Sequence, residues 1–171
     1  GDDPLGLRGL RDRIPEAWVD PEHGGRRSDD ELHVTVALKM SQPEHLERLE
    51  RLCADSPPIE LRVAEVFLSR VERIRDAEVY CIGAALEAPA LRGFKDLWLE
   101  EEGDPGARRR HDPYPDSDGH VSLAYVHAAA WEEAAAFVEV ANRELTAGGS
   151  FKAQGITYED ERRERMVLRL L

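Results

Sequence analysis

Two short segments of this chain alternate between apolar and polar residues, and each places a histidine two residues ahead of a hydroxyl. The first segment is LHVTVAL, residues 32–38, and the second is HVSLAYV, residues 120–126. Successive side chains of a β-strand point to opposite faces, so this alternation predicts two strands that each bury one face. The same spacing puts His33 beside Thr35 on one strand, and His120 beside Ser122 on the other.

The rest of the sequence predicts a mixed order of strands and helices. Pro43 and Pro89 each begin a segment with apolar residues at helical spacing, and an alanine-rich segment ending at Gly148 is also typical of a helix. Alternation predicts strands over residues 32–40, 59–71, 77–86, 120–126, 150–160 and 165–171, with 72–76 as a turn. A short helix followed by a loop is expected in residues 1–31.

The strand and helix order of residues 32–99 is repeated in residues 119–171. We therefore expect an α+β fold with antiparallel sheets, in which two lobes of similar order form one domain over residues 1–171. A chain of 171 residues is long enough for one such domain with a core of its own. The start at Gly1 leaves open that this domain comes from a larger protein.

Residues 100–119 show no periodicity, which predicts a long loop that is either a working lid or disordered. This loop contains the densest basic cluster of the chain, Arg108, Arg109 and Arg110, and we expect Arg110 to attract phosphate. Tyr114 is a candidate for stacking on a base. Arg26 and Arg27 occupy a comparable position ahead of the first histidine.

Composition narrows the class of ligand. The net charge of −12 argues against binding long stretches of nucleic acid, but a small phosphorylated ligand needs only a few local donors.

No apolar run is long enough for a membrane helix, so we expect an intracellular protein of the cytoplasm or nucleus. Cys53 and Cys81 lie in different predicted elements and are expected to be buried thiols.

Two histidines with two hydroxyls form a complete set of groups for cleaving a phosphodiester without a metal or cofactor. An imidazole has an ordinary pKa near 6.5, so at neutral pH one ring can accept a proton while the other donates one. Hydroxyls can donate to the non-bridging phosphate oxygens. We therefore predict His33 and His120 as the acid and base, with Thr35 and Ser122 as phosphate ligands. In the alternative reading, both histidines are only structural members of the sheets.

The pair HVTV and HVSL resembles the tandem His-x-Thr/Ser motifs of the 2H phosphoesterase superfamily. The pattern is closest to 2',3'-cyclic phosphodiesterases, including those of tRNA ligases, and to 2'-5' RNA ligase-like proteins. The resemblance implies a bilobal, pseudo-symmetric fold with two antiparallel sheets flanking a central cleft and helices outside. It also implies metal-independent opening of 2',3'-cyclic phosphate ends of RNA or small nucleotides to 2'-phosphates.

Several details of the resemblance stay open. Relatives often carry an aromatic residue or proline directly before the second motif, whereas here Tyr114 and Pro115 stand five to six residues earlier. We assign His33 as the acid and His120 as the base, and alternation predicts that Tyr125 turns away from the site. We expect the chain to be a monomer. Its expected ligand is a nucleotide or an RNA 3' end with a cyclic phosphate. The alternatives are a 2'-5' or 3'-5' phosphodiesterase or ligase, or a nucleotide-binding module without activity.

Overall fold

A computed structural model describes residues 3–100, 105–112, 114, 116–145 and 149–171, without the side chains of residues 105, 107 and 108. The chain forms two compact units. The first unit comprises residues 1–34, 62–86 and 120–150, and the second comprises residues 35–61, 87–119 and 151–171. Each of the two halves expected from the sequence therefore contributes segments to both units.

Most of the first unit is built on a five-stranded sheet. Its strands are β1 (Ile59–Leu68), β2 (Glu72–Ile74), β3 (Ala77–Glu87), β4 (His120–His127) and β5 (Ser150–Ala153), in the order β2-β3-β1-β5 with β4 beside β3. The pairings of β3 with β2 and with β4 are antiparallel. The prediction of a turn over residues 72–76 was wrong in part. Residues 72–74 pair with β3 as strand β2, and only Arg75 and Asp76 form the turn.

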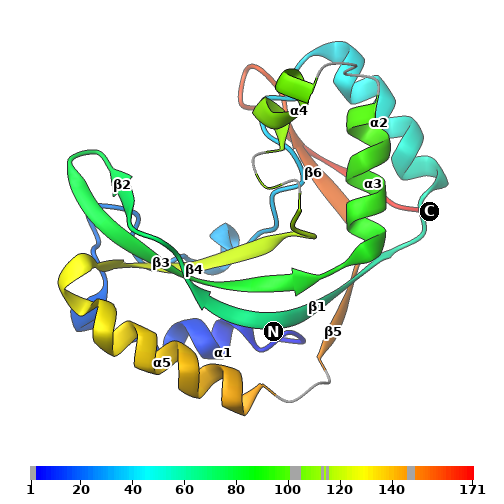
Figure 1. Ribbon diagram of the computed structural model, residues 1–171. Coiled ribbons are helices and arrows are strands. Elements are labelled where there is room, and N and C mark those ends of the chain that lie inside the picture. Colours follow the sequence, from blue (N-terminus) through cyan, green and yellow to red (C-terminus); the bar gives the residue numbers. More distant parts are fainter. Residues whose placement is uncertain (1–2, 101–104, 113, 115, 146–148) are drawn as a thin grey trace. The chain divides into compact units, whose positions relative to one another are not determined.

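Two helices cover one face of this sheet within the first unit. They are α1 (Leu7–Asp12) and α5 (Trp131–Glu144), and Figure 1 shows both on the same side of β3 and β4. The face that they cover includes Ile82, Ala84 and Val126, which have no exposed surface. The Asn142 amide joins α5 to β1, because its oxygen accepts from the Val66 N–H at 2.7 Å and its nitrogen donates to the Val66 carbonyl at 2.8 Å.

Residues 19–27 run along the side of β4 away from β3. Bridges join Val19 to Val126 and Arg26 to Ala124. The Asp20 carboxylate strengthens this attachment by pairing with His23 Nδ1 at 3.0 Å and with His127 Nδ1 at 3.3 Å. Burial alone would raise the pKa of Asp20, but the hydrogen bond from His23 and the charges of both histidines outweigh it and lower that pKa. Three short 3₁₀ turns also lie in this unit: Glu16–Trp18, Asp29–Glu31 and Ala128–Ala130.

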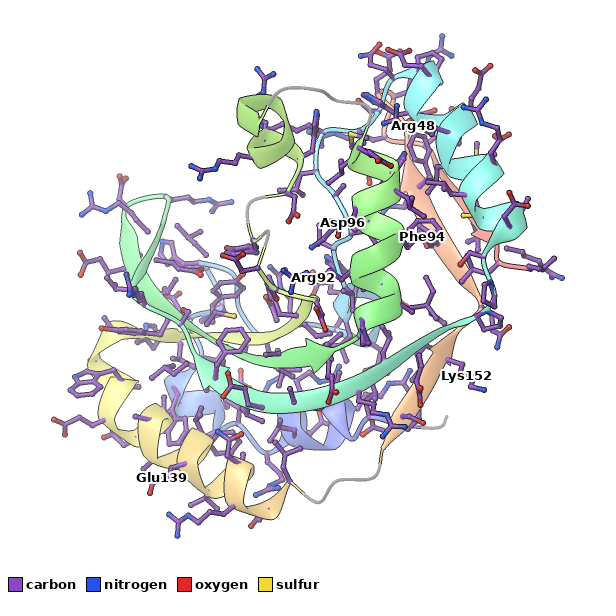
Figure 2. The ribbon with its side chains drawn as sticks, turned by 45° about the vertical axis from the view of Figure 1, so that its right-hand side comes forward. Arg48, Arg92, Phe94, Asp96, Glu139 and Lys152 are labelled. Carbon is purple, nitrogen blue, oxygen red and sulfur yellow. The ribbon has the colours of Figure 1, made fainter. Side chains whose placement is uncertain are left out.

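The second unit contains three helices, α2 (Pro43–Asp55), α3 (Pro89–Leu99) and α4 (Pro105–His111), and the antiparallel hairpin of β6 (Gly155–Glu159) and β7 (Arg165–Arg169). Helix α2 packs against α3 and against both strands of the hairpin, as Figure 1 shows for α3 and β6. Figure 2 shows Phe94 on one side of α3, with Arg92 and Asp96 on the other. Phe94 and Trp98 are buried, as the helical spacing of apolar residues predicts.

Three further predicted elements differ from the structure. The predicted strand over residues 32–40 was wrong, because no ladder of hydrogen bonds pairs residues 32–37 with any described residue. Residues 150–160 divide into β5 and β6, which belong to different sheets. The predicted loop 100–119 contains α4, whose alanine and arginines are good helix formers. Gly148, the expected helix end, and residues 101–104 lie outside the described residues.

Both cysteines are free and buried, as predicted. Among the described residues, no helix combines the length and apolar character needed to cross a membrane.

Candidate active site

Strand β4 places His120 and Ser122 on the same face of the five-stranded sheet. Antiparallel pairing sets His120 opposite Ala85 and Ser122 opposite Gly83, and paired residues point to the same side. Both side chains are half-buried, whereas Val121 between them is 3% exposed on the face covered by helices. We call the side of β3 and β4 that carries His120 and Ser122 the site face.

A β-bulge in β4 brings Tyr125 onto the site face as well. The pairing shifts between Ile82 and Gly83, so that Leu123 is an extra residue between Ser122 and Ala124. Tyr125 consequently pairs with Cys81, which lies two residues from Gly83 and shares its face. The prediction that Tyr125 turns away was therefore wrong, because one inserted residue reverses the alternation beyond it.

The Cys81 thiol lies beneath the polar groups of the site face. The thiol donates to the Ile82 carbonyl at 3.6 Å. Ser122, Tyr125 and Arg27 are each near enough to favour the charged form of the thiol. Burial nevertheless dominates and raises the pKa of Cys81, so the thiol is neutral at physiological pH. A buried thiol that keeps its proton is a poor nucleophile, so we infer that Cys81 has a packing role.

Phe67 of β1 covers the site face next to His120. Its ring centroid lies 6.0 Å from that of His120, with the planes at 75°, an edge-to-face arrangement. Gly83 makes room for this ring, since a Cβ there would lie 2.6 Å from Phe67 Cζ and 2.9 Å from the Val121 carbonyl oxygen. An isolated glycine within a strand is the signal in the sequence that could have indicated such a close approach.

His33 and His120 both belong to the first unit, although 86 residues separate them in the sequence, and His33 is near enough to act on His120 electrostatically. The pKa of His120 is lowered, first by burial and second by the positive charge of His33. His120 is therefore predominantly neutral at pH 7, the state in which an imidazole accepts a proton.

His33 is exposed, and its ring is oriented by its own backbone. Nδ1 lies 2.8 Å from the Glu31 carbonyl oxygen. A carbonyl only accepts hydrogen bonds, so Nδ1 carries the proton and Nε2 is the nitrogen at which a proton is gained or lost. The 3₁₀ turn Asp29–Glu31 is itself fixed by a capping box, in which the Ser28 N–H donates to the Glu31 carboxylate at 2.8 Å.

The structure places the other predicted site residues in the second unit. Thr35 is the first residue of that unit and is exposed. Arg110 is exposed on α4, and Tyr114 follows that helix with 56% of its surface exposed. The connection around Tyr114 is anchored to α3, since Lys95 Nζ lies 3.4 Å from the buried Asp112 carboxylate and donates to the Ser117 carbonyl at 3.0 Å.

No pattern in the sequence indicates that Phe67 and Cys81 are neighbours of the site. Arg27 is indicated only by its position ahead of the first motif. The histidines without a predicted role have structural partners. His23 and His127 pair with Asp20, and His111 Nδ1 donates to the Leu38 carbonyl at 2.7 Å. Among the described residues there is no cluster of three or more histidine, cysteine or acidic side chains arranged to hold a metal ion.

Comparison with known proteins identifies the fold. No protein-family model matches the chain, and no curated protein sequence matches it. Among solved structures it is similar to Usb1 of Kluyveromyces marxianus with uridine monophosphate, at a TM-score of 0.53 and 16% identity over 98% of this chain and 88% of that one. A second structure of Kluyveromyces marxianus Usb1 gives a TM-score of 0.50 and 16% identity, over 96% of this chain and 87% of that one.

The fold is 2H phosphoesterase-like. This agrees with the α+β class and the antiparallel sheets predicted from the sequence. At this level of identity the similarity shows the fold alone. Activity and site residues must therefore be argued from the side chains.

Proposed function

We propose that this protein is a metal-independent 2',3'-cyclic phosphodiesterase, which opens cyclic phosphate ends of RNA or of small nucleotides to 2'-phosphates inside the cell. His33 and His120 would be the catalytic acid and base. Ser122 would donate to a non-bridging phosphate oxygen, and the family resemblance assigns the same role to Thr35, two residues after His33.

The observation that carries this proposal is the unequal environment of two interacting imidazoles. Burial and the charge of His33 lower the pKa of His120, which favours the neutral ring and hence the role of base. His33 is exposed and holds its Nδ1 proton against the Glu31 carbonyl, which leaves Nε2 to deliver a proton. A protonated His33 further disfavours protonation of His120, so the two rings are biased toward opposite protonation states.

In the proposed reaction, His120 accepts one proton and His33 donates one. Neutral His120 removes a proton from a water molecule, whose oxygen bonds to phosphorus in line with the 3' oxygen. The bond between phosphorus and the 3' oxygen breaks, and protonated His33 donates its proton to that oxygen. The product is a 2'-phosphate with a free 3' hydroxyl, and proton exchange with solvent restores both rings.

The choice of a first substrate follows from the structural neighbour. Usb1 was solved with uridine monophosphate, and we therefore propose uridine 2',3'-cyclic phosphate as the nucleotide to assay first. Arg110 and Tyr114 stay predictions from the sequence as further substrate-binding residues. Their exposure in the second unit is compatible with contact to a ligand.

The decisive experiment compares His33→Ala and His120→Ala with the wild type on uridine 2',3'-cyclic phosphate in the presence of a chelator. Loss of a general acid or base reduces turnover by about 10²–10⁴-fold, so both variants should lose nearly all activity. His127→Ala is the matched control, because His127 lies on the same strand but pairs with Asp20. Near-normal turnover in either variant, or a wild type inhibited by the chelator, would refute the proposal.

A further inference from the structure

Arg26 and Arg27 are adjacent in the sequence but have different surroundings in the first unit. The Arg26 guanidinium is used within the protein. It donates to the backbone carbonyls of Arg11 and Ile14, and it pairs with Glu16 at 3.0 Å. These contacts hold residues 11–16 against the segment that runs along β4, so Arg26 has a structural role.

The Arg27 guanidinium lies over the ring of Tyr125 on the site face. Its Cζ is 5.1 Å from the ring centroid, within the range of a cation–π interaction. The guanidinium forms no hydrogen bond with any described residue, and its ion pair with Glu31 Oε1 is long, at 3.6 Å. A side chain 29% exposed therefore presents its N–H donors to a ligand.

The ring that carries Arg27 is itself held in place. Gly24 passes directly over it, with φ of +105°, and a Cβ at Gly24 would lie 2.5 Å from Tyr125 Cδ2. The backbone brackets the same residue, because the Asp20 N–H donates to the Tyr125 carbonyl at 3.0 Å and the Tyr125 N–H donates to the Gly25 carbonyl at 2.9 Å. The positive charge over the ring is thus fixed before a ligand arrives, which reduces the entropy lost on binding.

We propose that Arg27 binds a second phosphate of the substrate, separated by one sugar from the phosphate that reacts. This inference rests on the proposed function, which places the reacting phosphate at Ser122. Ser122 and Tyr125 pair with Gly83 and Cys81, two residues apart on β3, a separation of about 6–7 Å along the strand. A nucleotide that carries a 5'-phosphate in addition to the reacting phosphate has one anionic group for each of these two positions.

Arginine suits this role for two reasons. Its planar fork binds phosphate through two parallel charge-assisted hydrogen bonds. In a chain with a net charge of −12, an anionic substrate also needs a local positive charge near the site. A phosphate that replaces the long Glu31 contact would gain hydrogen bonds that the carboxylate does not make at 3.6 Å.

The test compares uridine 2',3'-cyclic phosphate with the same nucleotide carrying a 5'-phosphate. The wild type should prefer the 5'-phosphorylated substrate through a lower KM, and Arg27→Gln should reduce this preference by about tenfold or more. Arg27→Lys, which keeps the charge but not the planar fork, should retain part of the preference. Arg73→Gln is the matched control, because Arg73 also has one ion pair of 3.6 Å, to Glu78, on the opposite face of the sheet.

The possible outcomes separate this inference from the proposed function. Equal losses on the two substrates in Arg27→Gln, or an unchanged preference, would overturn the role of Arg27. If the wild type cleaves neither nucleotide, the proposed function fails. Calorimetry with uridine 3'-monophosphate and uridine 3',5'-bisphosphate then tests Arg27 by itself. Only an Arg27-dependent gain in affinity for the bisphosphate would support a second phosphate site.

Discussion

The two segments with the His-x-hydroxyl pattern have similar sequences but very different structural support. The second segment is strand β4, paired with β3 on one side and bridged to residues 19–27 on the other. The first segment, residues 32–37, forms no ladder with any described residue, and His33 is exposed whereas His120 is half-buried. The same local pattern can therefore place one histidine in a half-buried position within a sheet and another in an exposed position.

This difference gives the two imidazoles different chemistry. Burial beside Phe67 makes the charged form of His120 unfavourable, whereas the exposed His33 ring can exchange protons with solvent. An enzyme that uses one neutral and one protonated imidazole needs such an asymmetry. In identical environments the two rings would have equal pKa values, and neither ring would be favoured as the acid or as the base.

The largest expected difference between the segments is in stability, and the valine after each histidine tests it. Val121 is 3% exposed, whereas Val34 is only half-buried. Val121→Ala should lower the free energy of unfolding by about 2 kcal/mol and Val34→Ala by about 0.5 kcal/mol, measured by urea denaturation. Equal losses would mean that the first segment is as well packed as β4.

A smaller effect is expected at Gly83, which extends the support of the second histidine to β3. Gly83→Ala would push Phe67 away from His120 and should cost about 1 kcal/mol of unfolding free energy, with a loss of activity. Gly93→Ala in α3 is the control, because a Cβ there meets nothing within 4 Å and should be neutral or slightly stabilising. A fully active Gly83→Ala variant would show that this packing does not position His120.

The smallest effect is the pH dependence of stability that comes from His120. Because the folded-state pKa is lowered from 6.5, the unfolded chain takes up the proton more readily. The contribution of the neutral His120 ring to the free energy of unfolding is therefore complete above pH 6.5. It is lost as the pH falls from 6.5 toward the folded-state pKa. The stability of the wild type relative to His120→Gln should therefore decrease between pH 7.5 and 5.5. A difference independent of pH would contradict the lowered pKa.

Alternation predicted much of this structure from the sequence because it reports burial directly. It located β3 and β4 and the shared face of His120 and Ser122. Helical spacing located α2 and α3, and alanine content located α5. It also predicted a strand over residues 32–40, where the apolar residues alternate as in β4. Whether a segment forms a ladder depends on a partner strand distant in the sequence, which a local pattern does not contain.

The bulge at Leu123 was equally beyond a local pattern. Leucine is ordinary within a strand, and only the register with β3 shows that it is an extra residue. The position of Tyr125, and with it that of Arg27 on the site face, follows from this one residue. The contacts of Cys81 and Phe67 likewise depend on which strands are neighbours. The convergence of His33 and His120 on one phosphate stays a prediction from the motif.

The segment that carries Arg27 also shields the outer side of β4. Without residues 19–27, the N–H and C=O groups of that side would form an open sheet edge, of the kind that recruits strands from other molecules and leads to aggregation. Removing these residues should therefore make the chain prone to self-association. A minimal domain for expression therefore has to retain the residues ahead of the first histidine.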